Sequence, residues 1–141
     1  MAQAWSASKA PSATSRKKKA VAFDSSFLIA VMQSPTPWME DIADIVGAFV
    51  PVVLTSVRDE LKRLAAKDDK TGKFAGLALE LVDLGRLSLV QDGRGKPDDE
   101  IISFALNEGA AVATIDSDLA ERLRASKVRT VIMLHGGRVS T

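Results

Sequence analysis

Short apolar segments alternate with segments of helical periodicity along almost the entire chain. The apolar segments that predict strands occupy residues 19–24, 50–55, 86–91, 110–116 and 128–134. Helical spacing, caps and stops predict helices over residues 26–33, 38–49, 56–67, 74–85, 97–109 and 117–126. A strand that is apolar at every position is covered on both faces, which is typical of a parallel sheet. The sequence therefore predicts a three-layer α/β/α fold with a five-stranded parallel sheet.

One domain accommodates all of these elements, since the chain has 141 residues and is 46% hydrophobic. Residues 1–17 differ in composition: they are rich in Ala and Ser and contain several basic residues. We therefore expect a disordered basic leader over 1–17 and the folded domain over 18–141. The first 23 residues hold five of the 19 basic residues and no acid, so the remaining chain carries 14 basic and 18 acidic groups.

Several classes of site are excluded by composition. The chain has no cysteine, which removes disulfides and every site built on thiolates, and its single histidine, His135, makes a histidine-based triad improbable. The longest apolar run, residues 45–54, is too short to span a bilayer, and no signal peptide is visible. These features suit a cytoplasmic protein without a membrane partner.

Carboxylates cluster near the carboxyl ends of the predicted strands. Asp24 ends the first strand and Asp116 ends the fourth, with Asp118 two residues later. Glu60 lies in the helix after the second strand, and Asp98 opens the helix before the fourth. Ligands of open parallel sheets bind at this edge. Each acid alone could serve as a helix cap or pair with a surface cation. Together they would repel one another unless a divalent cation with oxygen ligands, Mg²⁺ or Mn²⁺, lay between them.

Three segments, "VAFDSSFLIAV", "LTSVRDELKRL" and "DDEIISFALNEGAAVATIDSDL", resemble the motifs of the PIN-domain family of metal-dependent ribonucleases. The resemblance covers roughly residues 20–134, and the third segment is the most specific. Its motif positions are filled by Asp98, Ile101, Ala105, Leu106, Gly109, Thr114, Asp116 and Asp118.

The resemblance implies an α/β/α fold and an acidic pocket that binds one or two Mg²⁺ or Mn²⁺ ions. The implied catalytic residues are Asp24, Glu60, Asp98 and Asp116, and the implied metal ligands are Asp24, Asp98, Asp116 and Asp118. Supporting roles fall to Ser25, Ser26 and Thr114. Either Asp98 or Asp99 can be aligned with the motif, and Asp98 fits the spacing to Ile101 and Asp116 better.

The implied activity is hydrolysis of RNA phosphodiesters to a 5′-phosphate and a 3′-hydroxyl. Arg94 and Lys96, in the loop before Asp98, are candidate phosphate contacts, as are Lys17, Lys18 and Lys19 at the junction of the leader and the folded domain. For both groups, ordinary surface charge is an equally good explanation. The loop "DGRGKPDD" lacks the spacing of a phosphate-binding P-loop.

Within the family, the sequence is more similar to stand-alone archaeal-type proteins, akin to the ribosomal-RNA-processing branch, than to VapC-type toxins. Two alternatives stay open: a toxin paired with an antitoxin, and a non-catalytic module that binds RNA or a ribosomal partner. The apolar helix region 38–49 could supply a homodimer interface, or could simply be core.

Overall fold

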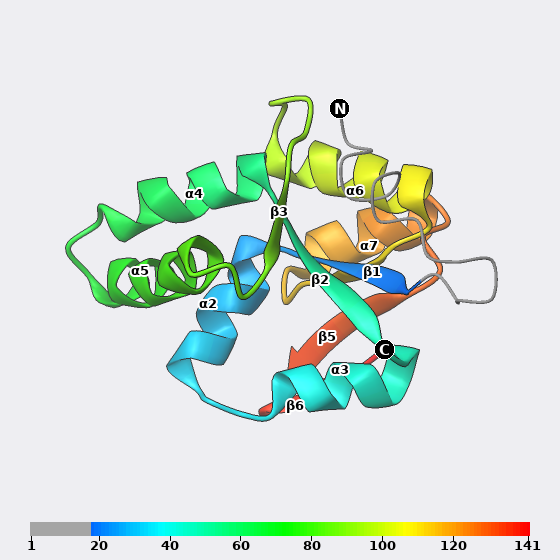
Figure 1. Cartoon of the computed structure of the whole chain (residues 1–141), viewed down its shortest axis with the longest axis horizontal. Coiled ribbons are helices and arrows are strands. Elements are labelled where there is room, and N and C mark those ends of the chain that lie inside the picture. Colours follow the sequence, from blue (N-terminus) through cyan, green and yellow to red (C-terminus); the bar gives the residue numbers. More distant parts are fainter. Residues whose placement is uncertain (1–17) are drawn as a thin grey trace.

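The computed structural model describes residues 18–141, so the predicted leader over 1–17 lies outside the described part of the chain. The described residues form a sheet flanked by helices (Figure 1). Its strands are β1 (Lys19–Phe23), β2 (Phe49–Leu54), β3 (Ser88–Val90), β4 (Ala111–Ala113), β5 (Val131–His135) and β6 (Arg138–Ser140). Its helices are α2 (Ser25–Gln33), α3 (Trp38–Val46), α4 (Thr55–Ala65), α5 (Lys70–Asp83), α6 (Pro97–Glu108) and α7 (Ser117–Ala125).

The sheet has the order β3-β2-β1-β4-β5-β6, and strands β1 to β5 are all parallel. From β1 the chain moves outward to β2 and β3, and then returns to the other side of β1 to form β4. The order of the strands therefore reverses between β1 and β4. In open parallel sheets, a crevice forms at such a switch point, beyond the carboxyl ends of the strands. The predicted α/β class and the five parallel strands are confirmed.

A sixth strand, β6, pairs with β5 in the antiparallel direction and was not predicted. It is joined to β5 by Gly136 and Gly137, whose φ angles are 56° and 80°. A two-residue turn of this kind requires positive φ at both positions, which glycine adopts without strain. The Gly-Gly pair was therefore a readable hairpin signal, but the following segment, only three residues long, has no apolar pattern of its own.

The other elements follow the sequence closely. Helix α6 begins with Pro97 at its first position and ends at Gly109, which takes a left-handed conformation with φ 64°. The predicted helix over 38–49 is shorter, because Gly47 ends α3 and Phe49 already belongs to β2. Pro51 lies within β2 but before the residues that pair with β3, where β2 has β1 as its neighbour and tolerates a missing N–H.

Burial of both faces of the sheet explains its continuous apolar strands. In Figure 1, α6 and α7 lie above the strands and α2 and α3 lie below them. Phe23 of β1 meets Phe27 of α2 and Trp38 of α3, with ring centroids 5.5–5.6 Å from Phe23. Such tilted aromatic pairs contribute about 0.5–1.5 kcal/mol beyond the area they bury. Trp38 thus packs against the core, whereas Ile45 on the same helix is 40% exposed.

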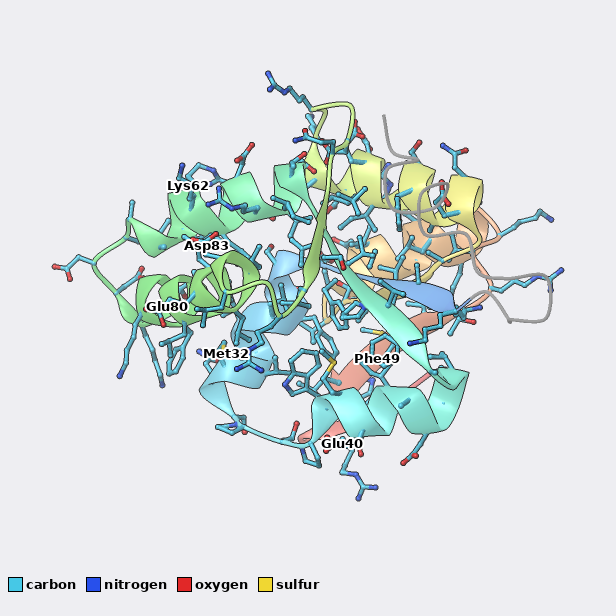
Figure 2. The ribbon with its side chains drawn as sticks, in the orientation of Figure 1. Met32, Glu40, Phe49, Lys62, Glu80 and Asp83 are labelled. Carbon is cyan, nitrogen blue, oxygen red and sulfur yellow. The ribbon has the colours of Figure 1, made fainter. Side chains whose placement is uncertain are left out.

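Helices α4 and α5 form an antiparallel hairpin that extends to the left in Figure 1. Asp83 lies between these helices in Figure 2 and accepts a hydrogen bond from Arg58 Nη2 at 2.9 Å. The side chain of Asp69 caps α5 by accepting from Gly72 N at 2.8 Å. This hairpin fixes the direction in which α4 leaves β2. Within residues 18–141, none of the helices combines the length and the apolar character that crossing a bilayer would require.

Candidate functional site

The switch point between β1 and β4 holds a buried carboxylate. Phe23 and Ala113 are partners in the sheet, so the next residues, Asp24 and Thr114, leave the two strands side by side. Asp24 N donates to Ala113 O at 3.0 Å, and the Thr114 hydroxyl donates to Asp24 Oδ2 at 2.8 Å. Asp24 is 4% exposed and Thr114 is fully buried. The sheet itself therefore fixes the position of this acid.

Two serines at the start of α2 extend the network around Asp24. The Ser26 hydroxyl donates to Asp24 Oδ2 at 2.6 Å and accepts from Ile115 N at 3.2 Å. The Ser25 hydroxyl donates to Glu60 Oε1 at 2.6 Å, which links α2 to α4. Glu60 also lies 3.5 Å from the guanidinium of Arg63. Small hydroxyl side chains at these two positions thus orient two of the predicted acids.

Asp116 is the N-cap of α7, so the helix-cap role considered for this acid in the sequence is present. Its Oδ1 accepts from Asp118 N at 2.9 Å and from Leu119 N at 3.2 Å. Its own N–H donates to Thr114 Oγ1 at 3.0 Å, so Thr114 bridges Asp24 and Asp116. The side chain of Asp118 is exposed at the start of the same helix.

Asp98 and Asp99 face different surroundings in the first turn of α6. Partial burial raises the pKa of Asp98 above its usual value, and the negative charges of Asp24, Asp116 and Glu60 raise it further. Asp99 instead pairs with Arg122 of α7, whose guanidinium lies 2.7 Å from its carboxylate. Of the two neighbours, Asp98 is the one that lies within the electrostatic field of the other acids.

Burial dominates the electrostatics of Asp24. It raises the pKa of the Asp24 carboxyl above its usual value, and the charge of Glu60 adds to this effect. Hydrogen bonds from Ser26, Thr114 and the backbone of Ser25 favour the ionised form and oppose the shift. The charges of Asp24, Asp116 and Glu60 thus all act on Asp98, and that of Glu60 also acts on Asp24, so these four acids form an acidic group at the switch point.

The acidic group suits a hydrated metal ion rather than a fully protein-bound one. Within residues 18–141, no three His, Asp or Glu side chains are placed so that they could hold a metal ion as they stand. The donors of the group are carboxylate oxygens, which suit Mg²⁺ and Mn²⁺. Mg²⁺ keeps several of its waters and is commonly held by one or two carboxylates together with substrate phosphates. The group fits a hydrated ion of this kind better than a complete protein cage.

A cleft of about 680 Å³ lies beside Glu60, between α4 and the loop that leads into α6. Glu60 and Pro97, which precedes Asp98, line its wall, together with Arg63 and Arg94. Of the predicted phosphate contacts, Arg94 thus borders the cleft, and Lys96 is an exposed residue at the N-cap position of α6 whose side chain makes no capping hydrogen bond.

The predicted phosphate contacts at Lys18 and Lys19 lie away from the cleft. Lys19 begins β1, so about 16 Å of extended strand separates it from Asp24 at the other end. It borders a second hollow of about 210 Å³, whose lining includes Lys127 and Arg129. The structure does not bring Lys18 and Lys19 to the acids, and Lys17 lies outside the described residues.

Three residues around the cleft were not identified from the sequence: Arg63, Asp92 and Glu100. Arg63 forms the 3.5 Å ion pair with Glu60. Glu100 accepts hydrogen bonds from Gly93 N and Gly95 N, both at 2.9 Å. A sequence signal for this role of Glu100 did exist. Two glycines shortly precede it, and it lies in the first turn of a helix, where carboxylates commonly accept hydrogen bonds from free backbone amides.

Comparisons with known proteins agree with this architecture. A solved structure described as the PIN domain endonuclease Utp24 superimposes with a TM-score of 0.69 at 20% identity, covering 85% of this chain and 88% of that chain. A domain of a functionally unknown protein from Methanocaldococcus jannaschii superimposes with a TM-score of 0.61 at 15% identity, covering 87% and 96%. No curated protein matches the sequence. The family described as PIN like domain matches residues 21–137, nearly all of the folded part, and the chain therefore belongs to the PIN-like domain family.

Proposed function

We propose that this protein is a Mg²⁺- or Mn²⁺-dependent endoribonuclease whose active site is the acidic group at the β1/β4 switch point. The observation that carries the proposal is geometric: the Thr114 hydroxyl joins Asp24 to Asp116 at the carboxyl ends of β1 and β4, and the Ser25 hydroxyl at the start of α2 binds Glu60. Burial raises the pKa of the neighbouring Asp98, and the charges of Asp24, Asp116 and Glu60 add to this effect. Membership of the PIN-like family supports nuclease chemistry, and the similar fold of an endonuclease agrees with it. RNA is the substrate that the family motifs imply.

In this proposal, one or two of the carboxylates of Asp24, Asp98 and Asp116 would hold a hydrated ion together with substrate phosphates, and Asp118 would contribute from the start of α7. When bound, the ion supplies Lewis-acid activation of water and neutralises charge on the phosphate. The role of the protein is to hold the carboxylates ionised and in place. Thr114 and Ser26 do this for Asp24 by donating to Oδ2, and Ser25 does it for Glu60. Glu60 is then available to accept a proton from the attacking water.

Cleavage of a labelled RNA in Mg²⁺ or Mn²⁺ tests the proposal directly. Asp98→Asn should abolish cleavage, because it removes a charge from the acidic group but keeps the size of the side chain. Asp99→Asn is the matched control, since Asp99 pairs with Arg122 and should be dispensable. Undiminished cleavage by the Asp98 variant, or by the wild-type protein in EDTA, would refute the proposal.

The same assay separates the alternatives. A non-catalytic module that binds RNA or a ribosomal partner would bind the labelled RNA and leave it intact. A VapC-type toxin would arrest growth on expression and be relieved by an antitoxin, whereas a ribosomal-RNA-processing enzyme would act on a precursor RNA. We favour the processing role in the cytoplasm. A homodimer through α3 is a separate prediction, and the oligomeric state in solution tests it.

A further inference from the structure

The loop between β3 and α6 is held by two carboxylates. Glu100 accepts from Gly93 N and Gly95 N, and Asp92 Oδ1 accepts from Arg94 N at 2.9 Å. Asp92 also anchors the loop to α4, because its Oδ2 accepts from Ser56 N at 3.0 Å. The backbone amides of residues 93–95 are therefore all occupied within the protein. They are not available to a phosphate, as the amides of a P-loop would be.

Glycine on both sides of Arg94 leaves room for the Glu100 carboxylate to lie close against the loop. A Cβ atom at Gly95 would lie 2.6 Å from Glu100 Oε2, and one at Gly93 would lie 3.1 Å from the same oxygen. Arg94 itself has φ 62°, a left-handed conformation that costs a non-glycine residue about 1 kcal/mol. A strained residue persists where its surroundings fix it, and such residues concentrate at functional sites. The hydrogen bonds of the loop thus hold Arg94 in one place, in a strained backbone conformation.

Two arginines border the cleft beside the acids, and they come from different elements: Arg63 from α4 and Arg94 from the loop. Arg63 is within 3.5 Å of Glu60, so its guanidinium lies next to a residue of the acidic group. The body of the protein is acidic, and a polyanion can approach the acids only where cations are held close to them. Asp59 also lines the cleft and opposes this attraction.

We propose that this cleft binds the phosphodiester backbone of the RNA next to the bond that is cleaved, with Arg63 and Arg94 as the phosphate contacts. Glu100 is a positioning residue that fixes Arg94 through the loop. The inference rests on the proposed function for the identity of the substrate, but it concerns binding and can be tested without cleavage. Each phosphate that an arginine neutralises makes binding more sensitive to salt. For a single strand, each contact adds about 0.7 to the steepness with which log K falls as log salt rises.

The experiment measures fluorescence anisotropy of a fluorescein-labelled single-stranded RNA in the Asp24→Asn background, which is expected not to cleave. Adding Arg63→Ala or Arg94→Gly should each reduce the salt slope by about 0.7. Lys127→Gly is the matched control: Lys127 is also a cation with positive φ, at 71°, but it borders the other hollow. It should relieve the same strain, remove the same charge and leave the slope unchanged. Asp59→Asn should tighten binding.

The positioning role of Glu100 is tested by a double-mutant cycle. Glu100→Gln should weaken binding in the presence of Arg94 and have no further effect in the Arg94→Gly variant, while urea unfolding shows both proteins folded. Equal weakening in both backgrounds would assign Glu100 a structural role only. Unchanged salt slopes in the arginine variants would refute RNA binding in the cleft, even if the wild-type protein cleaves RNA. Reduced slopes without any wild-type cleavage would support the cleft and refute the nuclease proposal.

Discussion

Replacing Thr114 by valine removes one hydroxyl group from the centre of the site and keeps the shape of the side chain. Three hydrogen bonds are lost: the 2.8 Å bond to Asp24 Oδ2, the 3.0 Å bond from Asp116 N and a longer bond of 3.3 Å with the Ser26 hydroxyl. A hydrogen bond to a charged group contributes about 1.5–3 kcal/mol and one between neutral groups about 0.5–1.5 kcal/mol. Because Thr114 is fully buried, water cannot replace the hydroxyl. We expect the free energy of unfolding to fall by about 2–4 kcal/mol.

The loss should depend on pH in a defined direction. The Thr114 hydroxyl favours the ionised form of Asp24, so its removal raises the pKa of that carboxyl further above its usual value. The native variant then binds the Asp24 proton more tightly than the wild type does, while the unfolded states are alike. The variant therefore loses more stability as the pH rises through the range in which Asp24 ionises.

Urea unfolding across this pH range measures the effect, with Thr114→Ser as the control. Serine keeps the hydroxyl and loses only a methyl group, so it should cost about 1 kcal/mol and show little pH dependence. Equal losses for the valine and serine variants, or a valine loss that does not change with pH, would show that Thr114 does not support an ionised Asp24.

Two further substitutions test the electrostatics and the packing. Asp98→Asn should raise the free energy of unfolding at neutral pH, because burial and three neighbouring acids raise the pKa of Asp98 in the folded state. This gain should shrink as the pH falls through the raised pKa of the folded state and should be absent below the pKa of the unfolded state, and denaturant titrations at several pH values would show it. Gly72→Ala should cost about 3 kcal/mol or more, since its Cβ would lie 2.0 Å from Lys67 O. Gly76→Ala, on the same helix with open space around it, should instead be neutral or stabilising in the same unfolding assay.

The fold was predictable because its signals are local. Continuous apolar strands and well-marked helix ends, such as Pro97 and Gly109, are properties of short segments, and the structure confirms both. Strand β6 was missed because a strand as short as residues 138–140, with an exposed, polar surface, has almost no pattern. Its existence depends on pairing with β5, which only the tertiary fold supplies.

The site was predictable in part for the same reason. The order of the strands places Asp24 and Asp116 at one edge, so their proximity follows from topology. The different surroundings of Asp98 and Asp99 do not, because the pairing of Asp99 with Arg122 depends on how α6 packs against α7. The cleft could not be predicted from the sequence. Arg63 and Arg94 are 31 positions apart and border the same cleft only because α4 packs beside the loop.

Binding of Mn²⁺ measured by calorimetry, without RNA, tests most directly whether the acids form one cation site. Asp24→Asn, Asp98→Asn and Asp116→Asn should each weaken binding by about tenfold or more, a change of about 1.4 kcal/mol. Asp99→Asn should bind Mn²⁺ as the wild type does. Wild-type affinity in both the Asp24 and the Asp98 variants would contradict the account, because the acids at the switch point would then not share a cation.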